Sequence, residues 1–202
     1  MNKPEILSSP NIPKPLHGLN PRGIMGQEKW DVVRQEVYAS TNYHCASCGV
    51  YKLQAKKHQW LEAHEIYDID YSKGIATLTE IVPLCHFCHN FIHSGRLRMM
   101  ARSRRVSAQD VRDIMRHGVA VLKSAKSPIF VGTQILCDLV SVDTKGLPKM
   151  SEPKGIAPWG DWVMLWDGKQ YRGKFKSMRD WQKAYATDHC QTTEGVSKEF
   201  AF

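Results

Sequence analysis

The sequence predicts an α+β fold, in which a core of two strands and one helix is flanked by further helices and by a small C-terminal hairpin and helix. Two Cys-x-x-Cys pairs bracket a segment in which apolar and polar residues alternate, as they do in strands. Apolar residues recur at helical spacing on both sides of that segment. Near the C-terminus, Asp167-Gly168 separates two strand-like runs, which predicts a two-residue hairpin.

The length and charge of the chain narrow its class. A chain of 202 residues holds one domain of ordinary size or two small ones. Its net charge of +8 favours a polyanionic partner, of which nucleic acid is the commonest. The N-terminal residues lack the apolar core of a signal peptide, and Pro128–Val142 is too short and too polar to span a bilayer. We therefore expect an intracellular, cytoplasmic protein, or one that is released from a cell without Sec export.

The composition also predicts how the chain is divided. Residues 1–26 carry five prolines, three glycines and little periodicity, which predicts an extended arm. We expect the main domain over residues 27–125, including a helix that follows the core. A small β-rich unit is expected over residues 126–186, and a disordered tail over residues 187–202.

The core is expected to follow the order strand, turn, strand, helix. Trp60–Ile66 alternates and predicts a strand, Asp70–Gly74 predicts a turn, and Ile75–Leu84 predicts a second strand. The pattern is helical over His86–Arg98. Gln27–Ser40 supplies an earlier helix, because its apolar residues fall on one face.

Further elements are expected in the second half of the chain. Ser107 is an N-cap candidate for a helix that runs to about residue 124. Pro128–Val142 is rich in residues that favour strands, and Asp143–Trp159 is typical of a long loop. Ser177–Tyr185 predicts a short helix after the hairpin.

The two cysteine pairs have the spacing of a zinc site. Its ligands would be Cys45, Cys48, Cys85 and Cys88. Zinc prefers four thiolates in a tetrahedron, and such closed sites are structural because no coordination position is left for water. Metal binding of this kind contributes on the order of 10 kcal/mol to folding. Cys137 and Cys190 have no partner at ligand spacing, and we interpret them as ordinary small apolar residues.

Three histidines lie between and just after the cysteine pairs. His89 and His93 are four residues apart on the predicted helix, so that both imidazoles lie on one face and can share an ion. His64 lies on the first predicted strand. The three side chains would converge if the helix packs across the two strands.

These motifs resemble those of a known family. LEAHEI at residues 61–66 and IVPLCHFCHNFIHSG at residues 81–95 are similar to the HNH nucleases, the ββα-metal fold, in their four-cysteine, zinc-stapled form. The resemblance covers roughly residues 30–98. It implies an endonuclease that nicks or cleaves DNA by hydrolysing a phosphodiester bond, using one divalent cation. That cation would be Mg²⁺ or Mn²⁺, although Zn²⁺ or Ni²⁺ also suits imidazole ligands.

The resemblance also implies roles for single residues. His64 would be the metal ligand from the strand, His89 and His93 would be the ligands from the helix, and Glu65 would take the place of the general base. Glu80 stands where the family has a middle asparagine. A usual HNH base is a histidine, so Glu65 needs a pKa raised by burial to serve as well.

A shifted alignment stays open beside this one. In it, His64 is the base, and Glu62, Asp68 or Asp70 lies near the metal. Strand alternation places Glu62 on the same face as His64 and leaves Glu65 on the other face.

Five arginines follow the histidines within ten residues. They are Arg96, Arg98, Arg102, Arg104 and Arg105. Beside a nuclease-like site they are expected to contact a phosphate backbone, most readily that of double-stranded DNA, although a solvated helix end would also explain them. A second function stays open: a zinc protein that kept the fold without the reaction and binds nucleic acid or protein, such as an inhibitor from a phage or mobile element.

Overall fold

The structure is a computed structural model that describes residues 2–150 and 153–186, and the chain forms two compact units. The first unit comprises Met1–Asn11, Met25–Ile66 and Thr79–Glu152. The second comprises Ile12–Ile24, Tyr67–Leu78 and Pro153–Phe202. Each unit is thus built from three separate segments, whereas the predicted domains were contiguous ranges. The predicted tail at residues 187–202 and Cys190 lie outside the described residues.

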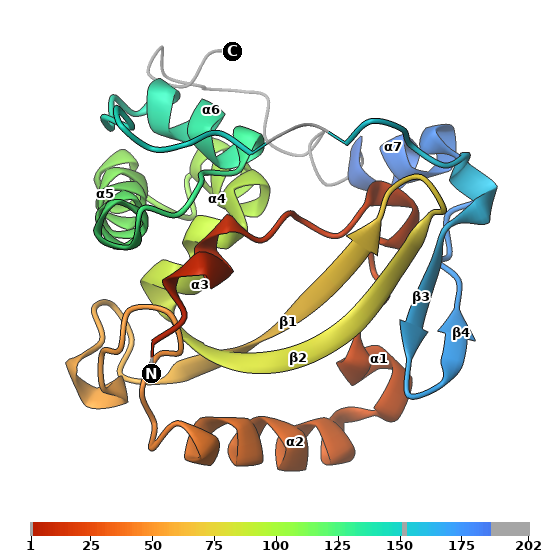
Figure 1. The fold of residues 1–202 in the computed structure, drawn as a ribbon, viewed down its shortest axis with the longest axis horizontal. Helices are drawn as coiled ribbons and strands as arrows, with labels where there is room; N and C mark the ends of the chain where they lie inside the picture. The colour runs from red at the N-terminus through yellow and green to blue at the C-terminus, as the bar shows by residue number, and fades with distance from the viewer. Residues whose placement is uncertain (1, 151–152, 187–202) are drawn as a thin grey trace. The chain divides into compact units, whose positions relative to one another are not determined.

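The α+β class is confirmed, because helices accompany a four-stranded sheet in the order β1-β2-β3-β4. Strand β1 (Leu61–Asp70) and strand β2 (Ile75–Cys85) form a long hairpin, which Figure 1 shows beside the two shorter strands. Strand β3 (Val163–Trp166) runs parallel to the start of β2, and β4 (Lys169–Tyr171) pairs antiparallel with β3. The predicted strands are therefore present, and β1 is longer than expected.

Both hairpin turns have local chemical causes. The Asp70 carboxylate accepts hydrogen bonds from the Ser72 hydroxyl at 2.7 Å and from the Ser72 amide at 3.1 Å, which closes the turn between β1 and β2. Between β3 and β4, Asp167 and Gly168 have φ values of 49° and 67°. Two positive φ values in a row are what a two-residue type I′ turn requires, as the Asp-Gly pair predicted.

Helices form most of the first unit. They are α2 (Gln27–Ser40), α3 (His86–Ile92), α4 (Ser94–Arg102), α5 (Ala108–Ala125) and α6 (Val131–Leu139). The predicted cap of α5 is confirmed, because the Asp110 amide donates to the Ser107 hydroxyl at 3.1 Å. Helices α3 to α6 gather into one group (Figure 1), and α5 buries Ile114, Met115 and Leu122. Burial of such side chains contributes roughly 1.5–3 kcal/mol each.

The predicted helix over His86–Arg98 is two helices, with the break at His93. His93 has a ψ of 43°, ends α3 and caps α4. The sequence explains the break, since Ser94 and Gly95 are weaker helix formers than their neighbours. The buried Ser94 hydroxyl is also hydrogen-bonded to Thr133 on α6 at 3.2 Å.

The prediction of a β-rich run over Pro128–Val142 is wrong, because α6 lies there. Thr133, Leu136 and Cys137 are buried, and their i, i+3, i+4 spacing is that of one helix face. β-branched residues favoured the strand, and burial of this face against α4 and α5 overrode that preference. Cys137 is fully buried, which confirms its apolar character, and burial raises the pKa of its thiol to about 12.

The N-terminal residues do not form an extended arm. They contain the 3-10 helices η1 (Pro4–Ser8) and η2 (Lys14–Leu16) and the short helix α1 (Pro21–Met25). Leu7 in the first unit and Leu16 in the second are fully buried. Helices this short show no apolar period that a sequence pattern could reveal.

The second unit has its own small core, made of Leu16, Ala76, Ala157, Trp162 and Met164. The remaining elements are η3 (Lys52–Gln54) in the first unit, and η4 (Trp159–Asp161) and α7 (Met178–Ala186) in the second. The predicted short helix after the hairpin is thus confirmed as α7. Across the described residues, none of the helices combines the length and the apolar character needed to traverse a bilayer.

Candidate metal centres

The first cysteine pair lies on a tight turn after α2. The Cys45 amide donates to the Val50 carbonyl, and the Gly49 amide donates to the Cys45 carbonyl, both at 2.9 Å. Gly49 has a φ of 75°, a left-handed conformation that glycine adopts without strain. The second pair sits where β2 meets α3, with Cys85 at the strand end and Cys88 in the first helical turn. Two elements distant in sequence therefore present four thiols to one point.

The geometry of the cysteine cluster could hold a zinc ion. The sulfur atoms of Cys45, Cys48, Cys85 and Cys88 all lie within 4.8 Å of one another. The sulfurs of Cys48 and Cys85 are 3.8 Å apart. A tetrahedron with zinc–sulfur bonds of about 2.3 Å has sulfur–sulfur edges of about 3.8 Å. All four are free thiols, and the spacing is that of metal ligands.

The four thiols cannot all ionise without a cation. Contacts with the sulfurs of Cys45 and Cys85 lower the pKa of Cys48 far below its usual value. Contacts with Cys45 and Cys48 raise the pKa of Cys88 far above it, so one thiolate forms at the expense of another. A bound dication removes this competition, because it deprotonates coordinating thiols outright.

One neighbour of the cysteine cluster was not predicted. His117 on α5 places its Nε2 atom 3.3 Å from the sulfur of Cys88. Groups in this position orient and stabilise metal-bound thiolates. No local pattern signals the contact, because His117 lies 29 residues from Cys88 and only the packing of α3 on α5 brings them together.

The three histidines of the second candidate centre converge. His64 comes from β1, His89 from α3, and His93 from the break between α3 and α4. Their ligand atoms lie within 4.8 Å of one another, a spacing at which one ion could be held. His64 and His89 are buried, with exposed fractions of 4% and 8%, and His93 is half-buried.

The environments of His64 and His93 favour the neutral imidazole, which is the form that binds metal. Burial, reinforced by the positive charge that neighbouring imidazoles would carry, lowers the pKa of His64 well below its usual value. Burial first, then His89 and Arg96, lower the pKa of His93 to about 3. The buried Nδ1 of His64 has no hydrogen-bond partner among the described residues. An unpartnered buried nitrogen is costly, and a cation at this point would satisfy it.

Glu62 supplies the carboxylate that contacts the helix. Its Oε2 atom lies 2.7 Å from Nδ1 of His89, and its Oε1 atom lies 3.0 Å from Nδ1 of His86. Burial alone would raise the pKa of Glu62, but the contacts with His86 and His89 hold it well below its usual range. A carboxylate beside a ligand imidazole is the usual device that orients metal-binding histidines.

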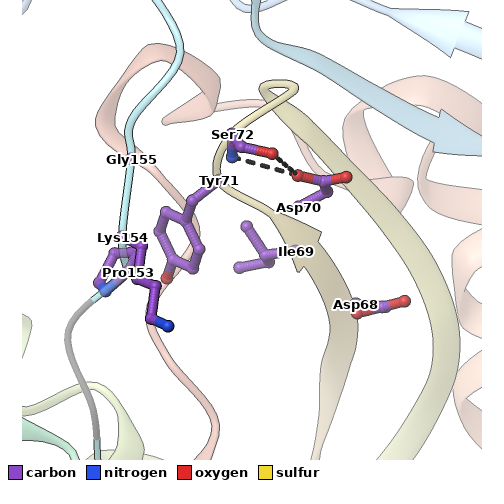
Figure 2. A pocket seen from close by; sticks show the side chains of 8 residues that line it. All are labelled: Asp68, Ile69, Asp70, Tyr71, Ser72, Pro153, Lys154 and Gly155. Carbon is purple, nitrogen blue, oxygen red and sulfur yellow. Dashed lines mark hydrogen bonds between the residues drawn. The ribbon is translucent and has the colours of Figure 1, made fainter.

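The other candidate carboxylates have different surroundings. Glu65 follows His64 on β1 and alternates to the opposite face, and burial raises its pKa. Asp70 is held in its turn by Ser72, as Figure 2 shows, and by Lys73, whose Nζ lies 2.8 Å from it. Asp68 is exposed, and together with Asp70 it lines a surface hollow (Figure 2). Glu80, in the place of the middle asparagine, pairs with Lys3 at 2.8 Å. Of the residues in the shifted alignment, Glu62 is thus the one in contact with the helical histidines.

The arginine run begins immediately after the histidines. Arg96, Arg98 and Arg102 lie on α4, and Arg104 and Arg105 follow it. Four of the five are exposed, and Arg98 is half-buried. The charge of Arg96 contributes to the lowered pKa of His93, which places the start of the run close to the histidine cluster.

Comparison of the chain with protein families, with curated proteins and with solved structures finds no match to any of them. The metal-ligand geometry therefore carries the functional argument.

Proposed function

We propose that this protein is a metal-dependent endonuclease that nicks or cleaves DNA, with an HNH-like ββα-metal core formed by β1, β2 and α3. One observation carries the proposal. Three histidines, from β1, from α3 and from the end of α3, converge on one point, with His64 and His89 buried, and a four-cysteine cluster ties the same helix to the preceding loop. A protein that used metal only to stabilise its fold would need only one of these clusters. Two clusters of different ligand chemistry indicate separate roles.

The ligand set bears on the choice of metal. A divalent cation at the histidines would supply Lewis-acid stabilisation of a phosphodiester during hydrolysis. Magnesium prefers oxygen ligands, whereas imidazole suits transition metals. Because the cluster contains three imidazoles and no carboxylate, we favour Mn²⁺, Ni²⁺ or Zn²⁺ over Mg²⁺.

The chain's own residues have distinct tasks in this proposal. His64, His89 and His93 hold the cation, and Glu62 orients the His89 ring. Glu65 has a pKa raised by burial, which brings a carboxylate closer to the range of an effective general base. The arginine run provides positive charge for phosphates beside the cluster. None of these groups reads a base sequence.

The test is conversion of supercoiled plasmid DNA to open circles. The native chain should nick in the presence of Mn²⁺ or Ni²⁺ and should lose that activity when the added metal is omitted. His89→Ala, purified identically, should show no nicking above background, because it removes one of three ligands. Agarose gels of timed reactions give the rates.

Two outcomes would count against the enzyme. If neither protein nicks with any divalent metal, the nuclease proposal fails. Equal nicking by both proteins would assign the activity to a contaminant or another site. The first outcome would favour a nucleic-acid- or protein-binding module over an enzyme. One observation already favours such a module: strand alternation places Glu65 on the face of β1 opposite His64.

Substitution of Glu65 and of Glu62 should impair different properties of the protein. Glu65→Gln should slow nicking by about 10²–10⁴-fold, the usual contribution of a general base, with Mn²⁺ affinity unchanged. Glu62→Gln should weaken Mn²⁺ affinity and activity together, by about 10–100-fold, because it releases the His89 ring. Nicking rates and Mn²⁺ titrations of both variants give the comparison. A fully active Glu65→Gln protein would instead support the shifted alignment, with His64 as the base.

A further inference from the structure

The first unit also has a surface hollow, lined by residues from α2, from the segments that precede and follow the first cysteine pair, and from the start of β1. Its volume is about 330 Å³, within the range of roughly 300–1,000 Å³ that small-molecule sites occupy. Three aromatic side chains, two cations, two amides and a leucine line it: Tyr38, Tyr43, Trp60, Arg34, Lys52, Gln35, Gln59 and Leu61. No acidic side chain is among the lining residues that the structure describes. The nuclease proposal assigns no role to this hollow.

Trp60 presents a fixed aromatic surface at the hollow. Its side chain is 54% exposed, although it is one of the largest apolar groups in the chain. The His58 ring stacks on it in parallel, with centroids 4.1 Å apart and planes at 9°. The His58 ring therefore covers one face of the indole and fixes its orientation, while about half of the Trp60 surface stays open to solvent. An aromatic platform that is already oriented loses little entropy when it binds a flat ligand.

Tyr43 and Lys52 also line the hollow. Asn42 and Tyr43 have φ values of 51° and 59°, a left-handed conformation that is costly for a bulky residue. The Tyr43 amide donates to the Tyr38 carbonyl at 2.9 Å, and the Lys52 amide donates to the Tyr43 carbonyl at 3.0 Å. These bonds hold the strained segment, and the Lys52 ammonium lies 4.0 Å from the centre of the Tyr43 ring. Such strain is found at binding and catalytic sites.

A series of direct contacts joins the hollow to the histidine cluster. The His58 ring that stacks on Trp60 meets the His86 ring edge-on, with centroids 4.5 Å apart. His86 contacts one oxygen of Glu62 at 3.0 Å, and the other oxygen contacts His89 at 2.7 Å. A ligand on Trp60 would therefore occupy a defined position relative to the proposed catalytic metal.

We propose that this hollow binds an unpaired nucleotide, with the base stacked on Trp60 and the phosphate beside Lys52 and Arg34. Aromatic faces stack on bases of every kind, and a neighbouring ammonium or guanidinium pairs with phosphate. A base inside a duplex has both faces covered by its neighbours and cannot stack there. The inference rests on the proposed nuclease function, and it names the substrate class: DNA with a single-stranded segment or an unpaired nucleotide near the cut.

The test measures binding without cleavage. The chain, with no added divalent metal, is titrated against two fluorescent probes of equal charge: an oligothymidylate and a blunt-ended, two-stranded DNA duplex in which every base is paired. Trp60→Ala should weaken binding of the oligothymidylate by about 5- to 150-fold, the range for loss of one base–aromatic stack. Binding of the duplex should change less than twofold. Trp60→Phe, which keeps an aromatic ring, should stay within about threefold of the native chain.

A matched pair of lysine variants tests the phosphate contact. Lys52→Gln should weaken binding of the oligothymidylate by several-fold more than Lys29→Gln, since Lys29 is exposed on α2 but does not line the hollow. Equal losses would mean that the two lysines act only through net charge. That result would overturn the assigned phosphate position.

The outcomes separate this inference from the nuclease proposal. If the native chain does not bind the oligothymidylate, or if Trp60→Ala weakens both probes equally, the nucleotide site is wrong, whether or not plasmid is nicked. If Trp60→Ala weakens only the oligothymidylate while the native chain never nicks, the site stands and the nuclease proposal fails. Thermal unfolding of the variants should match the native chain, because the Trp60 side chain is largely exposed.

Discussion

Cys85→Ser is expected to abolish cooperative unfolding of the first unit and to leave the protein with little or no zinc. Cys85 supplies one of four sulfurs within 4.8 Å of one another, at the junction of β2 and α3. Structural zinc contributes roughly 10–16 kcal/mol in small zinc-binding peptides. A whole domain is stable by only about 5–15 kcal/mol. Loss of the ion is therefore expected to remove as much stabilisation as the whole free energy of unfolding of a typical domain. Circular dichroism during thermal unfolding, with zinc measured by mass spectrometry, gives the result.

The control for this variant is Cys137→Ala. Cys137 is as fully buried as Cys88 but does not belong to the four-sulfur cluster. The control should keep one zinc per chain and unfold cooperatively, with a loss of about 1 kcal/mol, the usual size of a point-mutation effect. A Cys85→Ser protein that is zinc-free and still unfolds cooperatively would contradict the structural role of the cluster.

His93→Ala is expected to spare the fold and to reduce metal-dependent nicking by at least about 100-fold. Replacing a residue that merely orients a metal ligand typically costs about 10–100-fold, so loss of a ligand should cost more. The fold should survive because His93 is not part of the cysteine cluster and lies at the break between α3 and α4, outside the helices α3 and α5 that pack together. Plasmid nicking and thermal unfolding of the same preparation separate the two effects.

His44→Ala provides the matched histidine control. His44 is exposed, and its ring contacts backbone carbonyls in the loop before the first cysteine pair and the ring of Tyr51, with centroids 5.2 Å apart. The His44→Ala protein should nick at the native rate. Native nicking by a folded His93→Ala protein would exclude the histidine cluster as the active site.

The parts of the fold that depend on local patterns could be predicted from the sequence. The Ser107 cap predicts a helix to about residue 124, and helix α5 begins directly after Ser107 and ends at Ala125. The Asp167-Gly168 turn follows from two residues that accept positive φ. The cysteine cluster could also be predicted, because the spacing within each pair already brings two ligands together. Only one further contact, between the loop of the first pair and the helix of the second, completes the cluster.

The parts that depend on packing could not be predicted. The β-branched residues of helix α6 favour a strand, and they led to the wrong prediction over Pro128–Val142. The segment is helical because one of its faces is buried against α4 and α5, which a local pattern does not reveal. Leu7 and Leu16 were missed because a 3-10 helix of three to five residues has no detectable period. In the histidine cluster, alternation along β1 pointed to Glu62, but only the structure places its two oxygens against His86 and His89.

We propose that one chain holds two metals at separate centres, one for structure and one for chemistry. A titration of the zinc-loaded chain with Mn²⁺, followed by calorimetry or electron paramagnetic resonance, measures this directly. We predict that the native chain binds one Mn²⁺ in addition to one zinc, and that His93→Ala keeps the zinc but binds no Mn²⁺. A native chain that binds no ion beyond zinc, or a His93→Ala protein that binds Mn²⁺ as the native chain does, would contradict the claim.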